Sequence, residues 1–123
     1  MKFKKVTATS SHPDFPVTQV TDGDDYSWWI ADQDKFPQVV TFELDQTTKV
    51  VGTRVRLQKD SSKYRYKVEG SLDGTTWEEL YEKECTGWDF KPVKLEKVLK
   101  FIRVSILEVS EGRAGLAEVT LFQ

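Results

Sequence analysis

Residues 22–27 hold the densest group of oxygen-bearing side chains in this 123-residue chain, in the string Asp-Gly-Asp-Asp-Tyr-Ser. Calcium takes six to eight oxygen ligands at about 2.3–2.6 Å, drawn from carboxylates, carbonyls and hydroxyls. Asp22 offers a carboxylate, Gly23 permits a tight turn, and the carbonyls of Asp24 and Ser27 with the Ser27 hydroxyl offer further oxygens. The same residues also suit a solvated turn whose carboxylates accept backbone N–H groups. The residues alone leave both interpretations open.

Side chains suited to covalent catalysis are few. The chain has one cysteine, Cys85, and one histidine, His12. A single cysteine excludes an internal disulfide and a metal site of several thiolates, and Cys85 is expected to be a small, partly buried apolar residue. A nucleophile would need His12 as its base, and His12 stands in a Ser-Ser-His-Pro loop, where we expect a loop residue and not a ligand contact. The prediction is that the domain is not an enzyme; a hydrolase using Asp32 and Glu118 is the alternative.

Charge and chain length limit the classes of partner that the protein can bind. The 18 basic and 20 acidic residues leave a net charge of -2, which disfavours nonspecific nucleic-acid binding because such binding depends on neutralising phosphates. No apolar stretch approaches the roughly 20 residues that cross a bilayer, and residues 1–5 precede no apolar run of signal-peptide length. We therefore expect one domain, 1–123, with no nucleic-acid or membrane partner, either intracellular or part of a longer chain, and monomeric.

Alternation of apolar and polar residues recurs along the chain. Val55 and Leu57 alternate with arginines, and Ile102, Val104 and Ile106 alternate with polar neighbours. Such short runs, rich in β-branched and aromatic residues and separated by Asp-Gly and similar turns, are typical of half-buried strands. The predicted strands are 3–9, 38–44, 49–58, 63–71, 76–84, 91–96, 99–108 and 115–122. The pattern predicts an all-β protein with an antiparallel sandwich or barrel.

Two segments do not fit strands. Residues 10–37 contain three of the four prolines and little alternation, and residues 84–92 carry Trp88 and Phe90 among polar side chains. Long ordered loops in compact domains are usually functional. The Asp73-Gly74 pair, by contrast, predicts only a hairpin turn.

Five motifs in order resemble the discoidin, or coagulation factor V/VIII type C, superfamily. They are DGDDYSWW (22–29), FPQ (36–38), YKVEGSLDGTTW (66–77), FIRV (101–104) and GLAEV (115–119). The resemblance implies a galactose-binding-like jelly roll, in which Trp29, Tyr66 and Trp77 are core aromatics. The eukaryotic members usually close their ends with a disulfide, which one cysteine cannot form. The resemblance is thus closest to the bacterial family 32 carbohydrate-binding modules, which are typically attached to glycoside hydrolases.

The same resemblance implies a structural calcium and an extracellular or cell-surface location. Its ligands would be Asp22, Asp24 and Ser27, joined by the Glu118 carboxylate and by carbonyls of Gln19 and Ala117. The implied role is noncatalytic: the module anchors a partner enzyme to glycans. The alternative is a discoidin-type domain that recognises a protein or membrane surface. Its exposed apolar contact residues would be Phe15, Trp88 and Phe90, with the basic Lys91 nearby.

Sugars are bound by an aromatic ring against their C–H face and by hydrogen-bonding side chains around it. By resemblance, the site lies in three loops at one end of the sandwich, here 30–35, 58–63 and 111–115. Galactose binders often carry a His after the tryptophan, where this chain has Ile30 and Ala31, so typical galactose specificity is not expected. Trp28, Phe36 or Trp88 would be the platform. The predicted carbohydrate-binding residues are Trp28, Asp32, Gln58, Lys59, Trp88 and Arg113.

Overall fold

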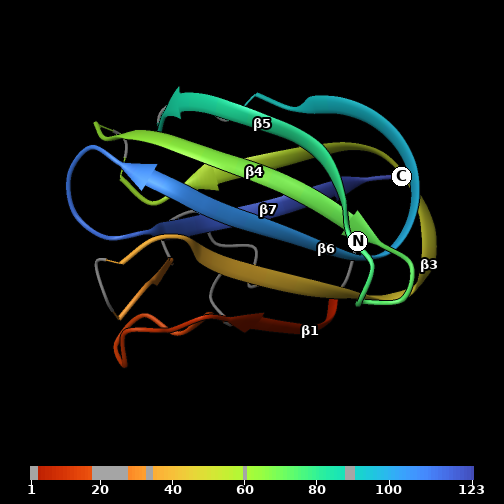
Figure 1. Cartoon of the computed structure of the whole chain (residues 1–123), viewed down its shortest axis with the longest axis horizontal. Coiled ribbons are helices and arrows are strands. Elements are labelled where there is room, and N and C mark those ends of the chain that lie inside the picture. The colour runs from red at the N-terminus through yellow and green to blue at the C-terminus, as the bar shows by residue number, and fades with distance from the viewer. Residues whose placement is uncertain (1–2, 18–27, 33–34, 60, 88–90) are drawn as a thin grey trace.

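The computed structural model describes residues 3–17, 28–32, 35–59, 61–87 and 91–123. Within these residues the chain forms seven strands, and all their pairings are antiparallel (Figure 1). They are β1 (Phe3–Ala8), β2 (Trp29–Ile30), β3 (Gln38–Leu57), β4 (Lys63–Ser71), β5 (Glu78–Thr86), β6 (Val93–Val109) and β7 (Gly115–Phe122). No helix in the described part of the chain is long and apolar enough to cross a membrane.

Two long strands, β3 and β6, belong to both layers of the fold. The strand order is β2-β7-β3-β6-β4-β5, with β1 on β3. Residues 40–44 of β3 pair with β1, whereas residues 52–57 pair with β7. Residues 101–109 of β6 pair with β4, which carries β5 on its other side. Because both strands pass from one layer to the other, the single seven-stranded sheet folds over on itself into two layers. The predicted antiparallel sandwich is confirmed.

The sequence pattern predicted two strands in place of each of these long strands. The predicted strands 38–44 and 49–58 are one strand, β3, and 91–96 with 99–108 are one strand, β6. The pairing of β3 with β6 shifts register between Glu43 and Thr48 and again between Val50 and Gly52. Register irregularities bend a strand without ending it, which is why exposed polar residues at the bend look like a turn in the sequence. The short strand β2 was not predicted.

The core contains two of the three aromatic residues expected there. Trp29 is completely buried and Tyr66 is 2% exposed, as predicted. Trp77 differs: it is only half-buried and lies outside the core cluster. Its ring packs edge-on against Phe101, with centroids 6.5 Å apart, and the Arg103 guanidinium lies 4.1 Å from its centroid. Trp77 therefore covers the outer surface of the β4–β6 layer.

The two ends of the sandwich differ. At the end on the left of Figure 1, strands β1, β5 and β6 end and strands β4 and β7 begin, so the loops between them gather there. Phe3 of β1 pairs with Leu44, and Phe122 of β7 pairs with Gly52, so β1 begins and β7 ends at the other end. The loop-bearing end, called the loop end below, contains the described residues 9–16, 30–32, 35–37, 58–59, 61–63 and 110–115.

Candidate functional site

Three predicted sugar-binding loops meet at the loop end. β2 places Ile30 opposite Gly115 of β7. Beyond this pair, the Ala31 N–H donates to the Ala114 carbonyl (2.9 Å), and the Gln58 N–H donates to the Gly115 carbonyl (3.2 Å). The described residues of the loops 30–35, 58–63 and 111–115, which are far apart in the sequence, therefore border one another. Their role in binding sugar stays a prediction.

Gly115 makes this meeting sterically possible. A Cβ at this position would lie 2.7 Å from Cβ of Gln58 and 3.0 Å from the Trp29 carbonyl oxygen. Contacts between carbon atoms are most favourable at about 3.5–4.0 Å, so a larger residue would push the first two loops away from the third.

Side-chain and backbone bonds also join the second loop to the third. The Lys59 ammonium lies 3.6 Å from the Glu111 carboxylate, and the Ser62 hydroxyl donates to the Glu111 carbonyl (3.3 Å). The Lys59 N–H donates to the Tyr64 hydroxyl oxygen (3.0 Å). Since Tyr64 is 2% exposed, this bond anchors the loop to the core. The loop end is thus held in place before any ligand arrives.

The N-terminal loop completes the same end, which the sequence did not predict. The Trp29 indole N–H donates to the Ser10 carbonyl (2.9 Å) and the Ser11 hydroxyl oxygen (3.0 Å), and the Asp32 N–H donates to the Ser10 hydroxyl oxygen (3.1 Å). The His12 N–H donates to the Ile30 carbonyl (2.8 Å). Ser10 and Ser11 lie 18 or more residues before Trp29 in the sequence, so this contact is decided by the tertiary structure.

The described sugar-site candidates vary in exposure. Asp32, Lys59 and Arg113 are exposed, whereas Trp28 and Gln58 are half-buried. Arg113 forms no ion pair or hydrogen bond with the residues that the structure describes. Trp88 lies outside the described residues. Among the suggested platforms, Phe36 follows the first loop and is 37% exposed.

Two of the predicted calcium ligands are among the residues that the structure describes, and four are not. Gln19, Asp22, Asp24 and Ser27 lie outside the described residues. Ala117 has no register partner on β3, because the pairing skips from Arg56–Glu118 to Leu57–Leu116. A bulge of this kind turns a residue out of the regular ladder, which fits a carbonyl ligand, and the half-buried Glu118 carboxylate is next to it.

Glu118 also stands directly opposite Arg56 on β3, a positive charge within reach of the same face. Among the described residues no group of three or more His, Cys, Asp and Glu side chains could hold a metal ion. The calcium site therefore stays a prediction.

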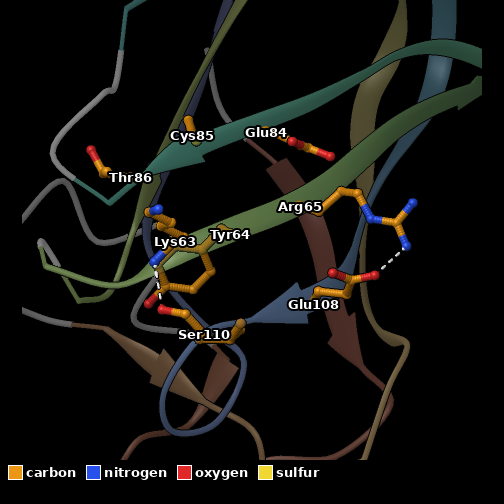
Figure 2. Close-up of a pocket in the computed structure, with 9 residues that line it drawn as sticks. Lys63, Tyr64, Arg65, Glu84, Cys85, Thr86, Glu108 and Ser110 are labelled. Carbon is orange, nitrogen blue, oxygen red and sulfur yellow. Dashed lines mark hydrogen bonds and ion pairs between the residues drawn. The ribbon is translucent and has the colours of Figure 1, made fainter.

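A groove of about 480 Å³ lies beside the loop end (Figure 2). It is lined by the first residues of β4 and the last residues of β5 and β6. Figure 2 shows Arg65 reaching toward Glu108, with Nη2 2.6 Å from Oε1. The Lys63 N–H donates to the Ser110 hydroxyl oxygen (2.9 Å). Nothing in the sequence indicated this groove, because its walls come from three strands.

The profile of the F5/8 type C domain matches residues 5–119, nearly the whole chain. The chain belongs to this family. The resemblance to the discoidin superfamily is therefore confirmed. A comparison with curated protein sequences found no match.

Solved structures share the fold of this F5/8 type C domain. The module CpGH89CBM32-5 from Clostridium perfringens, in complex with GalNAc-β-1,3-galactose, has a TM-score of 0.87 at 24% identity, over 97% of this chain and 94% of that one. The family 32 module of NanJ from C. perfringens, in complex with galactose, has a TM-score of 0.85 at 17% identity, over 97% and 93%.

The CBM32 of AlyQ, in complex with 4,5-unsaturated mannuronic acid, has a TM-score of 0.84 at 20% identity, over 99% and 96%. A truncated AlyQ with CBM32 and alginate lyase domains is matched over 32% of its length. At these identities the likeness shows the fold, and the jelly-roll architecture is confirmed.

Proposed function

We propose that this domain is a noncatalytic carbohydrate-binding module that anchors a partner enzyme, a glycoside hydrolase, to glycans outside the cell or at its surface. One observation carries the proposal: three loops of an F5/8 type C fold converge at one end and present Asp32, Lys59 and Arg113 to solvent. Structures of the same fold hold GalNAc-β-1,3-galactose, galactose and an unsaturated mannuronic acid. A match to one domain of a longer lyase supports the link to an enzyme.

The arrangement of the fold suits such a role. β1 begins and β7 ends away from the loop end, so a glycan at the loops would not meet either. Asp32 and Glu118, the pair considered for hydrolysis, lie in different surroundings: Asp32 is exposed in a loop, and Glu118 is half-buried in β7 opposite Arg56.

The site would bind weakly. An aromatic platform and a few hydrogen bonds to charged groups at an exposed surface correspond to a dissociation constant on the order of 0.1–1 mM. Such affinity suffices for a tethered module, because linking it to an enzyme raises the effective concentration of the enzyme at a glycan surface.

A structural calcium is part of the proposal. Glu118 and the bulged Ala117 would supply a carboxylate and a carbonyl from β7, and Asp22, Asp24, Ser27 and Gln19 would supply the remaining oxygens. When bound, the ion would neutralise carboxylates of two segments and hold them together. Galactose itself is not the expected preference, because Ile30 and Ala31 stand where galactose binders often carry a histidine.

The test is a glycan array, followed by titration of the hits with amide chemical shifts as the readout. We expect shifts around Asp32, Gln58 and Arg113, and no turnover of aryl glycosides. If no sugar up to about 20 mM, some twenty times the weakest expected constant, perturbs these amides, the proposal is wrong. Binding to liposomes or to a protein in place of glycans would then favour the discoidin-type surface-recognition role.

A further inference from the structure

We infer that the groove formed by the ends of β4, β5 and β6 is a second contact region for the glycan, taking the next residues of a neutral oligosaccharide whose first residue lies at the loop end. The inference rests on the proposed function, because the groove extends a sugar site at the loops. Its volume of about 480 Å³ falls within the roughly 300–1,000 Å³ of small-molecule sites.

The walls of the groove are cross-linked. The Arg65 guanidinium is held by Glu108 at 2.6 Å and lies 3.8 Å from the Glu82 carboxylate. The Lys63 N–H donates to the Ser110 hydroxyl, and the Ser110 N–H donates to the Lys63 carbonyl, both at 2.9 Å. Groups held in this way lose little conformational entropy when a ligand binds.

Several polar groups of the groove have no partner among the residues that the structure describes. The Lys63 ammonium, the Glu84 carboxylate and the Thr86 hydroxyl make no hydrogen bond or ion pair within the described part of the chain. The register places them together, with Lys63 opposite Thr86 and Arg65 opposite Glu84. An ammonium donates, a carboxylate accepts and a hydroxyl does both, which complements saccharide hydroxyls that also do both.

The charges of the groove indicate which glycans it accepts. Lys63 and Arg65 are balanced by Glu84 and Glu108, so the four side chains sum to no net charge. A uronate chain would meet Glu84 and Glu108 as well as Lys63 and Arg65, so the groove offers its carboxylates no net attraction, and removing those charges from water has a cost. A neutral polyhydroxyl ligand has no charge to remove from water.

The groove is continuous with the predicted sugar loops. Lys63 is the last residue of the second loop, and Ser110 directly precedes the third. Between them, the Gly87 N–H donates to the Ser62 carbonyl (3.0 Å), and the Ser62 hydroxyl donates to the Glu111 carbonyl (3.3 Å). The end of β5, the second loop and the third loop are thus one connected surface, along which a sugar chain can run.

The experiment measures affinity against oligosaccharide length. Galacto-, gluco- and manno-oligosaccharides of one, two and four residues, and mannuronate oligomers of the same lengths, are titrated by calorimetry into the wild type and into Lys63→Met and Glu84→Gln. In the neutral series that binds, we expect the tetrasaccharide to bind about five- to tenfold more tightly than the monosaccharide, as one or two added hydrogen bonds would give. Mannuronate oligomers should show no gain with length.

Both variants should lose most of this gain and keep the affinity for the monosaccharide. Lys97→Met and Glu78→Gln, which alter an exposed lysine–glutamate pair at the opposite end of β5 (2.8 Å), are the matched controls and should behave as wild type. Binding that does not depend on length, or a gain unchanged in both groove variants, overturns this inference and leaves the proposed function intact. Binding of no saccharide at all overturns both.

Discussion

Replacing Gly115 with alanine tests whether close packing at this position holds the loop end together. The added Cβ would lie 2.7 Å from Cβ of Gln58 and 3.0 Å from the Trp29 carbonyl oxygen. The first contact is about 1 Å shorter than a favourable carbon–carbon distance, and neither atom is the free end of a side chain. Overpacking of this kind costs about 1–3 kcal/mol. At about 4 °C per kcal/mol for a domain of this size, Gly115→Ala should melt roughly 4–12 °C below wild type.

Gly112→Ala is the control. Gly112 has a φ of +88° and nothing within 4 Å of a built Cβ, so an alanine there meets only the backbone cost of about 1 kcal/mol. A double variant with Gln58→Gly removes Cβ and Cγ of Gln58, two of the three atoms within 3.2 Å of the added Cβ, and leaves the Trp29 carbonyl oxygen. We expect it to lose less stability than the two single variants added together, by about 1 kcal/mol. Thermal melts that place Gly115→Ala no lower than Gly112→Ala, or a strictly additive cycle, would refute the packing argument.

Three further predictions concern calcium, the glycan and the pH dependence of the turn at Asp73. A strong chelator should lower the melting temperature by roughly 10 °C, since a ligand at a hundredfold excess over its dissociation constant contributes about 2.7 kcal/mol. The melting temperatures of Asp22→Ala and Glu118→Ala should not change when chelator is added. A wild-type melt unaffected by chelator would exclude a tight site. Arg113→Ala should weaken glycan binding about tenfold in a titration while leaving the melt unchanged, because an exposed side chain without described partners adds little to stability. Hydrogen bonds from the Thr76 and Thr75 N–H groups, and then from the Ser71 hydroxyl, hold the pKa of Asp73 well below its ordinary value. The stability that these hydrogen bonds contribute is therefore present above about pH 4 and is lost as the pH falls toward the lower folded-state pKa. Asp73→Asn should therefore flatten the acid limb of a profile of melting temperature against pH. An acid limb unchanged in the variant would contradict the role given to Asp73.

The strand pattern was largely predictable because side-chain alternation is a local property. Ile102, Val104 and Ile106 are completely buried core residues of β6 at the predicted spacing of two, and β4 and β7 have the predicted bounds. The failures are at places where a distant partner decides. The bend in β3 depends on register shifts against β6, and the two residues of β2 become a strand only because β7 lies beside them. Periodicity in one segment carries no information about either.

Trp77 shows the same limit for burial. Its motif position resembles a core aromatic, and its size favours burial, yet its ring lies on the outer face between Phe101 and Arg103. The sequence around Trp77 does not reveal that an arginine from another strand covers it. Burial is set by the neighbours of a residue in space.

By itself the sequence determined the family, the antiparallel sandwich and the three loops worth testing, because order of motifs, alternation and turn residues are written along the chain. Tertiary structure alone decided how those loops meet: Gly115 against Gln58, Ala31 against Ala114, and Ser10 under the Trp29 indole. It alone also formed the groove of Lys63, Arg65 and Glu84 beside them. The reason is physical. Contacts between residues some 20 to 80 positions apart depend on strand pairing across the whole domain, and no local pattern specifies that pairing.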